Sequence, residues 1–308
     1  MINFSNLIIL QCTLFIYMSA GWAATKLKIL NALGIKCITD LVICIVLPCN
    51  IITSFYVEMD FNVLLSTGKI FLIAFMIQLM QLGLSKILFL HMKGKRRKVM
   101  EYGTICSNAG YLGNPVVEGI YGTDGLLYAS VYLIPARLFL WSAGLACFTA
   151  TTKKEIVKNL AKHPCIIAVE IGLILMIFQI HLPIIIEKSI RGIGNCSTFL
   201  SMFTIGGVIS NASMKTLFSK DNFYYCFVRL CIVPVLALII GLVLHFDLLL
   251  LGISVILAGM PAGTTMTLLA SKYEGDADFA SKATVLSTVF SMGTIPLLCI
   301  LLIKLKMG

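Results

Sequence analysis

The chain alternates long apolar runs with short polar links, and this pattern sets the expected architecture. A helix needs about 20 apolar residues to cross a bilayer, and ten runs of roughly that length follow one another. They lie near 2–24, 34–57, 64–91, 100–121, 125–151, 164–181, 188–213, 222–246, 248–272 and 277–303. The sequence therefore predicts an all-α membrane protein with ten transmembrane helices and no sizeable soluble domain.

Composition agrees with a membrane protein. The 308 residues are 59% hydrophobic and only 12% charged, whereas soluble proteins average about 25% charged residues. The first basic residue, Lys26, follows the first apolar run, and a secretory signal carries its positive charge in front of that run. We therefore expect a first membrane helix rather than a cleaved signal, in a multi-pass protein of the cell (plasma) membrane.

The fourth apolar run contains a segment of low helix propensity, SNAGYLGNP at 107–115. Proline lacks an N–H and clashes with the preceding turn, so we predict that the helix opens just before Pro115. Gly110 and Gly113 let the backbone leave helical angles at little steric cost. An opened helix at membrane depth persists only where protein or a water-filled cavity covers its polar backbone.

The ninth run is interrupted in the same way, by AGMPAGTT at 258–265. The residues after the two interruptions are also alike, since YGTD at 121–124 corresponds to YEGD at 273–276. Paired segments of this kind in two halves of a chain point to a transporter's binding site. The alternative is two ordinary proline kinks.

Two repeats and a topology follow from this order. Residues 1–151 form a first five-helix repeat, 152–163 a cytoplasmic link, and 164–308 a second repeat, inverted because five is odd. Helices four and nine then cross near the midplane. Most of the 24 Lys and Arg residues fall in links from an odd helix to the next even one, so these links should be cytoplasmic and both termini extracytoplasmic. Lys304 and Lys306 lie on the wrong side by this rule.

The net charge of +10 does not indicate nucleic acid. The basic run 93–98 is better explained as a topology anchor near anionic membrane lipid. The 11 cysteines lie mostly inside apolar runs without a CxxC pair, and neither HExxH, GxSxG nor a phosphate-binding loop occurs. We expect no metal, no cofactor and no enzymatic activity.

The two proline motifs, together with Leu47-Pro48 and Arg229-Leu230 followed by Pro234, resemble the auxin efflux carrier family, in its compact prokaryotic permease type. The resemblance covers essentially the whole chain. It implies two inverted five-helix repeats, crossed helices four and nine, and elevator-like transport with helices one, two, six and seven as scaffold. It also implies a small organic anion as substrate, with coupling to protons or another ion such as Na⁺.

The function expected is thus secondary active transport of a mono- or dicarboxylate. An anion-conducting channel or uniporter of the same fold is the alternative, because polar breaks could also line a pore. A homodimer is an assembly that the sequence leaves open.

The substrate-binding candidates are polar or helix-breaking groups at the two interruptions, together with one embedded cation. They are Asn108, Asn114, Pro115, Arg137, Pro261, Thr264 and Thr265. Simple capping of the opened backbone is the alternative for the amides and hydroxyls. Arg137 lies mid-span, where charge is expensive. It either holds a substrate carboxylate or forms a structural pair with Glu118, Glu170 or backbone carbonyls.

Two further charges need interpretation. Glu118 follows Pro115 by nearly one turn and is the candidate for proton coupling, although its place near a helix end favours a solvated, outward-facing acid. Arg229 lies near a predicted cytoplasmic end, where we expect it to snorkel or to pair locally.

Overall fold

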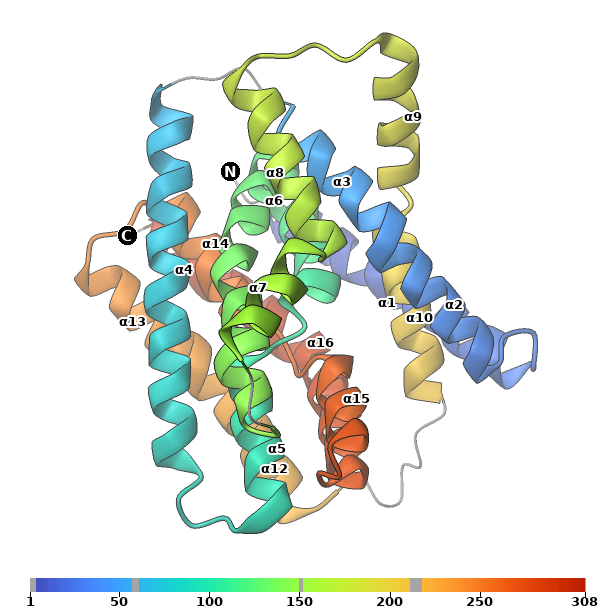
Figure 1. Cartoon of the computed structure of the whole chain (residues 1–308), viewed down its shortest axis with the longest axis vertical. Coiled ribbons are helices and arrows are strands. Elements are labelled where there is room, and N and C mark those ends of the chain that lie inside the picture. Colours follow the sequence, from blue (N-terminus) through green and yellow to red (C-terminus); the bar gives the residue numbers. More distant parts are fainter. Residues whose placement is uncertain (1–3, 57–60, 150–151, 211–217, 308) are drawn as a thin grey trace. The chain divides into compact units, whose positions relative to one another are not determined.

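The computed structural model describes residues 4–56, 61–149, 152–210 and 218–307. It is helical over 84% of its length (Figure 1). Within these ranges the extended structure amounts to one isolated antiparallel bridge between Ser107 and Ala262. The all-α prediction is confirmed.

Six of the described segments are long and apolar enough to span a membrane. They are Ala32–Ser54, Phe61–Leu88, Ala109–Gly144, Ile184–Ser210, Lys220–Val243 and Ala277–Leu305. Two shorter apolar helices are α8 (Pro164–Ile177) and α14 (Leu248–Ala258). These segments support a multi-pass membrane protein, while the count of ten spans stays a prediction.

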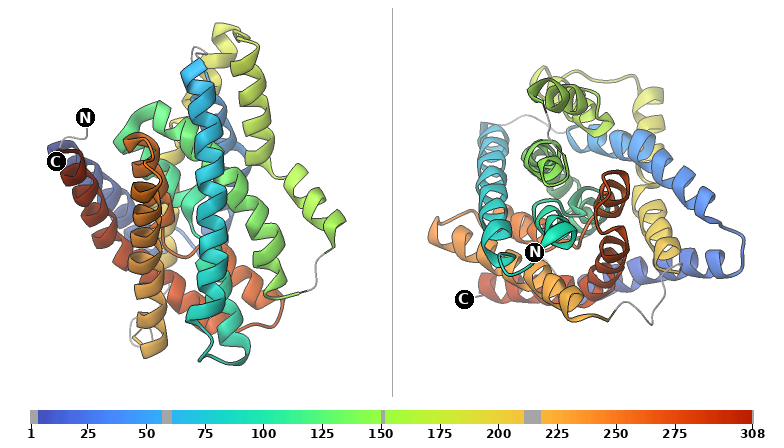
Figure 2. Two further views of the ribbon diagram at one scale, coloured as in Figure 1. Left: turned by 90° about the vertical axis from the view of Figure 1, so that its left-hand side faces the viewer. Right: turned by 60° about the horizontal axis from the view of Figure 1, so that its bottom comes forward.

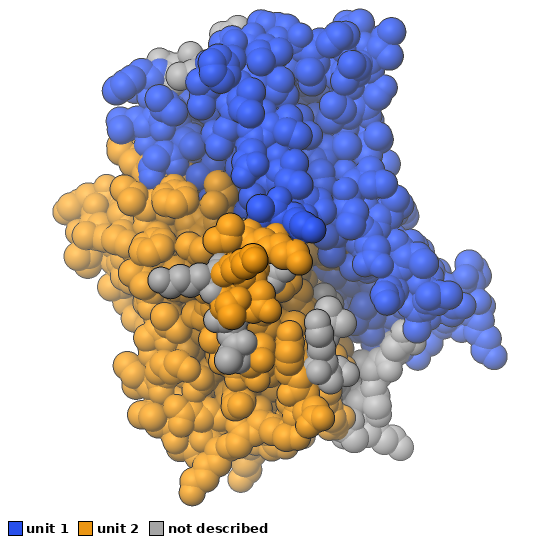
Figure 3. Space-filling model, viewed as in Figure 1, with its two compact units in different colours: residues 1–68, 114–131, 161–212 blue, residues 69–113, 132–160, 213–308 orange. Residues whose placement is uncertain are grey.

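The chain packs into two compact units, each drawing on both halves of the sequence (Figure 3). Unit 1 contains 1–68, 114–131 and 161–212, and unit 2 contains 69–113, 132–160 and 213–308. This division by packing does not test the predicted repeats, because a repeat need not form a compact unit.

The helices of unit 1 are α1 (Phe4–Lys26), α2 (Ala32–Leu41), η1 (Val42–Val46), α3 (Leu47–Ser54), the first part of α6 (Asn114–Phe139), α8, α9 (Ile184–Gly194) and α10 (Ser197–Ser210). Those of unit 2 are most of α4 (Phe61–Leu88), α5 (Gly94–Ile105), η2 (Ala109–Gly113), the end of α6, η3 (Leu140–Gly144), α7 (Lys153–Ala161), α12 (Lys220–Phe227), η4 (Val228–Ile232), α13 (Val233–Val243), α14, α15 (Thr264–Lys272) and α16 (Ala277–Met307).

In unit 1, α1 and α10 lie side by side with their backbones in contact (Figure 1). A Cβ built on Gly21 would stand 1.8 Å from the carbonyl oxygen of Phe203, and one built on Gly206 equally close to that of Met18. Small residues allow this close approach, which drives helix association in lipid, where the hydrophobic effect is absent. The glycines therefore fix how these two helices pair.

Three of the four described π turns end two residues before a proline. The turns are η1, η2 and η4, and the prolines are Pro48, Pro115 and Pro234. In a regular helix the proline ring clashes with the carbonyl four residues earlier, and that residue is the middle one of each turn. The wider π turn removes the clash without breaking the helix. The proline-free α4, by contrast, is a long unbroken rod (Figure 2).

The prediction that the fourth helix opens just before Pro115 is wrong. Gly113 keeps helical angles (φ −70°, ψ −42°), because the π turn absorbs the proline. The backbone becomes extended earlier, at Cys106 (φ −116°, ψ 101°). Gly113 instead permits close packing, since a Cβ there would lie 2.7 Å from Cδ2 of Leu257.

Two other predicted interruptions are confirmed. Gly122 breaks α6 with φ 70° and ψ −159°, a left-handed conformation that glycine adopts readily, and it lies where we expected helix four to end and helix five to begin. In the ninth run, α14 ends at Ala258 and α15 begins at Thr264. Pro261 thus lies in a non-helical segment.

Candidate functional site

Within unit 2 the two interrupted segments meet backbone to backbone. The N–H of Asn108 donates a hydrogen bond to the carbonyl oxygen of Pro261 over 2.8 Å, and Ser107 pairs with Ala262 in the isolated bridge. Opened backbone at membrane depth must find partners inside the protein. Here each segment supplies partners for the other.

Helix ends surround this junction. The carbonyl oxygen of Asn108 accepts from the N–H groups of Leu112 and Gly113, at 3.0 and 3.3 Å, which starts η2. On the other segment, the N–H of Ala262 donates to Oγ of Ser287 over 3.2 Å, and α15 begins at Thr264. The first N–H groups of a helix lack intrahelical acceptors and carry partial positive charge, so the start of α15 favours a negative group.

Of the two threonines in the second segment, Thr265 contacts a neighbouring helix. The hydroxyl of Tyr102 donates to Oγ1 of Thr265 over 3.0 Å, which ties α15 to α5. The side chain of Thr264 lies outside the described residues.

Arg137 lies at the first interrupted segment. Its side chain is only 8% exposed, and its Nη2 would stand 3.6 Å from a Cβ built on Gly110. The structure thus brings a buried guanidinium to the opened helix of unit 2. A part in substrate binding stays a prediction.

Asn114 and Pro115 begin α6 and belong to unit 1 by the packing division. Asn114 is 1% exposed, and neither its amide oxygen nor its amide nitrogen has a hydrogen-bond partner among the described residues. A buried amide without partners costs about 1–3 kcal/mol. A bound solute or water would remove that cost.

Glu118 is half-buried in unit 1 and accepts hydrogen bonds from the Nδ2 of Asn50, at 3.2 Å to Oε1 and 3.4 Å to Oε2. Asn50 is itself 3% exposed, and its α3 backbone lies 2.9 Å from where a Cβ on Gly194 would stand. Asn50 was not among the residues predicted from the sequence. The available signal was an amide two residues after Pro48 inside an apolar run, since polar side chains are rare in lipid unless they serve a function.

The expectation that Arg229 snorkels or pairs locally is wrong. Arg229 is 0% exposed, and its Nε, Nη1 and Nη2 all lack a hydrogen-bond partner in the described part of the chain. It stands in the π turn η4, whose helix is packed into the interior of unit 2. Helix position along the sequence could not show which face of that helix is buried.

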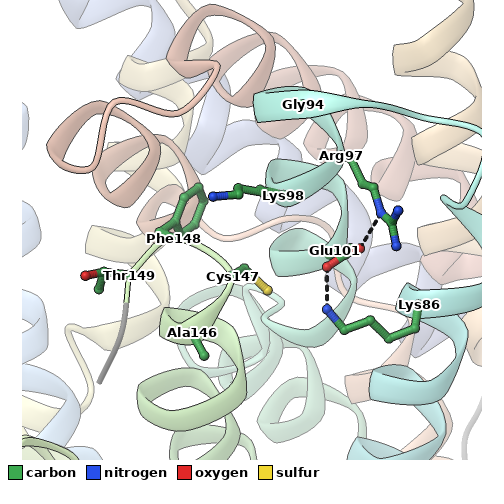
Figure 4. Close-up of a pocket in the computed structure, with 9 residues that line it drawn as sticks. All are labelled: Lys86, Gly94, Arg97, Lys98, Glu101, Ala146, Cys147, Phe148 and Thr149. Atoms are coloured by element: carbon green, nitrogen blue, oxygen red, sulfur yellow. Dashed lines mark hydrogen bonds and ion pairs between the residues drawn. The ribbon is translucent and has the colours of Figure 1, made fainter. Parts of the chain in front are cut away.

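A pocket of about 600 Å³ lies at the N-terminal part of α5, also in unit 2 (Figure 4). Buried Glu101 accepts from Nζ of Lys86 and, over 2.7 Å, from Nε of Arg97. Lys98 extends towards the ring of Phe148 across the pocket (Figure 4). Two cations thus pair with one carboxylate, and a third cation lies on the other side of the pocket (Figure 4).

The basic run 93–98 also makes contacts inside unit 2. Arg96 pairs with Asp221 over 2.7 Å and with Asp276 over 3.1 Å. It thereby connects the starts of α5 and α12 with the turn before α16. Contact of this run with lipid stays a prediction.

Comparison with known proteins gives the family. A family profile described as "Membrane transport protein" matches residues 8–159 and 148–299. An uncharacterized transporter of Methanothermobacter thermautotrophicus is 29% identical over 198 residues, covering 63% of this chain and 65% of that protein. The chain therefore spans just under two thirds of this relative's length.

Two other relatives are also named uncharacterized transporters. That of Methanocaldococcus jannaschii is 23% identical over 287 residues, covering 90% of this chain and 92% of its own. YfdV of Escherichia coli K12 is 23% identical over 175 residues, covering 53% and 55%. With both halves of the sequence matched by one profile, the chain belongs to the auxin efflux carrier family of membrane transport proteins.

Proposed function

We propose that this protein is a secondary active transporter of a small organic anion, a mono- or dicarboxylate, and that the substrate binds at the junction of the two interrupted segments. The observation that carries the proposal is the hydrogen bond from Asn108 to Pro261 inside unit 2. Polar backbone is placed there within apolar sequence, as transporters of this architecture place it.

Charge supports an anion as the substrate. Buried Arg137 lies beside Gly110, and the N-terminus of α15 follows Pro261. A guanidinium binds a carboxylate through two parallel hydrogen bonds, and a helix N-terminus adds favourable dipoles. The cationic pocket at Lys86, Arg97 and Lys98 would raise the local concentration of anions.

The packing division supports an elevator-like mechanism. Unit 1 contains the expected scaffold, helices one, two, six and seven, together with 114–131, and unit 2 contains the other helices. In this proposal unit 2 carries the substrate, helices four and nine cross at the midplane of two inverted repeats, and both termini face outward.

Coupling to protons is proposed at Glu118. A carboxylate that is half-buried and bonded to the Asn50 amide can change its proton occupancy when its surroundings change. Coupling to Na⁺ is the alternative, with carboxylate and amide oxygens as the ligands available.

A thermal-shift screen of the purified protein tests substrate binding. A solute that binds only the native state raises the melting temperature. We expect at least one mono- or dicarboxylate to do so at one of two pH values, and Arg137→Gln to reduce the shift. An equal lack of response to every carboxylate would count against the proposal, and a channel without a saturable site is the function that would then be favoured.

A further inference from the structure

Arg229 is the most anomalous charge in unit 2. It is fully buried, and none of its three side-chain nitrogens has an acceptor in the described ranges. An unpaired cation in a low-dielectric interior costs several kcal/mol even after relaxation. A bound anion would remove that cost.

The surroundings of Arg229 are polar and equally short of partners. Tyr225 precedes it by one helical turn on the same face, and Tyr132 and Cys106 also lie within electrostatic range of its charge. Both tyrosine hydroxyls are buried, and neither has a hydrogen-bond partner among the residues described. One guanidinium and two hydroxyls therefore offer donors without acceptors in one region of unit 2.

The local backbone makes room for this group. A Cβ on Gly103 would stand 2.3 Å from the Tyr225 hydroxyl oxygen, so only glycine admits that hydroxyl beside α5. Arg229 itself belongs to the π turn before Pro234, and π turns inside helices are frequent at functional sites.

We propose that Arg229, Tyr132 and Tyr225 form a buried binding site for a carboxylate group in unit 2. The guanidinium balances the charge of the carboxylate, and the two tyrosine hydroxyls donate hydrogen bonds to the carboxylate oxygens. The inference rests on the proposed function for its ligand class, and it adds a subsite that neither proline motif contains.

Packed residues connect the basic pocket with this group. Cys147 lines the pocket, and its N–H donates to the Gly144 carbonyl over 3.0 Å. A Cβ on Gly144 would in turn lie 2.6 Å from Sγ of Cys106, which interacts electrostatically with Arg229. Because these residues pack closely, a solute reaches Arg229 from the pocket only when the contacts part.

Arginine modification tests the site without a transport assay. The purified protein is treated with phenylglyoxal, and the five arginines are followed by peptide mass spectrometry in sodium malonate, in sodium benzoate and in sodium chloride of equal ionic strength. We expect Arg229 to react, and to react at least about fivefold more slowly in one carboxylate than in chloride. Exposed Arg191 should react equally in all three. Arg229 that stays unmodified while Arg191 reacts fully, or that reacts equally fast in all three salts, overturns the proposal.

A pair of variants separates a binding role from a structural one. In Arg229→Met the buried charge is gone, so the melting temperature without carboxylate should stay the same or rise, while the carboxylate-induced shift is lost. Arg191→Met should keep that shift. A melting temperature several degrees lower for Arg229→Met, with the carboxylate shift retained, identifies a structural arginine and overturns the site.

The two proposals fail separately. If Arg229→Met still shows carboxylate counterflow, the subsite is rejected while the proposed transport function stands. If carboxylate protects Arg229 from modification but the protein transports no carboxylate, the proposed transport function is rejected while the anion site stands.

Discussion

The backbone N–H of Asn108 donates to the carbonyl oxygen of Pro261 over 2.8 Å, although about half of the chain separates the two residues. Each belongs to a segment where an apolar helix is interrupted, and each segment satisfies backbone groups of the other. This pairing brings the ends of η2 and α15 into one packing unit, and buried Arg137 lies beside Gly110 of η2.

Close packing at Gly113 should be essential to the pairing. Gly113→Ala places a Cβ 2.7 Å from Leu257 and 3.2 Å from Met260, and overpacking of this kind costs about 1–3 kcal/mol. We expect a melting temperature lower by a few degrees, together with weaker carboxylate binding. The control is Gly83→Ala, because nothing lies within 4 Å of that position in α4. Equal stability of the two variants would show that the segments separate freely.

The hydroxyl pair of Tyr102 and Thr265 should stabilise the junction by an ordinary amount. Tyr102→Phe and Thr265→Val each remove one side of a 3.0 Å hydrogen bond. A double-mutant cycle on unfolding free energy should give a coupling of about 0.5–1.5 kcal/mol. Strict additivity of the two single changes would contradict the contact.

The contact of α1 with α10 predicts a strong effect from one methyl group. Gly206→Ala drives a Cβ to 1.8 Å from the Met18 carbonyl oxygen, so the helices must separate. We expect poor folding yield or a loss of several degrees in melting temperature. Gly192→Ala in α9 meets nothing within 4 Å and should behave as wild type. If both variants fold equally well, these helices do not pack as described.

Coupling at Glu118 predicts a specific loss. In Glu118→Gln, uptake driven by a pH gradient should fall at least tenfold, while exchange of substrate at equal pH continues, because only the proton carrier is removed. The matched control is Glu187→Gln, which changes a partly exposed acid of α9 that pairs with Arg191. Uptake by Glu118→Gln that still responds to a pH gradient would assign coupling elsewhere.

Much of the fold could be predicted from local sequence. Apolar run length predicted membrane helices, the boundary between runs at 121–125 matches the kink at Gly122, and Gly-x-Pro-x-Gly at 259–263 marked a true break. These features depend on residues that are next to one another in sequence, so they could be predicted from the sequence alone. The prediction at Pro115 was wrong because a π turn can accommodate a proline as well as an opening of the helix can. Packing against the neighbouring helices decides which of the two forms.

The candidate site was only partly predictable for the same reason. Asn108 and Pro261 were identified because both lie at conspicuous breaks. The burial of Arg229 and the bond from Asn50 to Glu118 depend on which helix face meets which neighbour. Helical periodicity carries little of that information when every face is apolar.

Counterflow in proteoliposomes distinguishes a carrier of carboxylates from a channel. Purified protein is reconstituted, and uptake of labelled mono- and dicarboxylates is measured with and without the same unlabelled solute inside. We expect uptake that saturates and that internal substrate accelerates, and we expect Arg137→Gln to lose both properties. Flux that rises linearly with concentration, ignores internal substrate and carries a large electrical current would contradict a carrier and identify a channel.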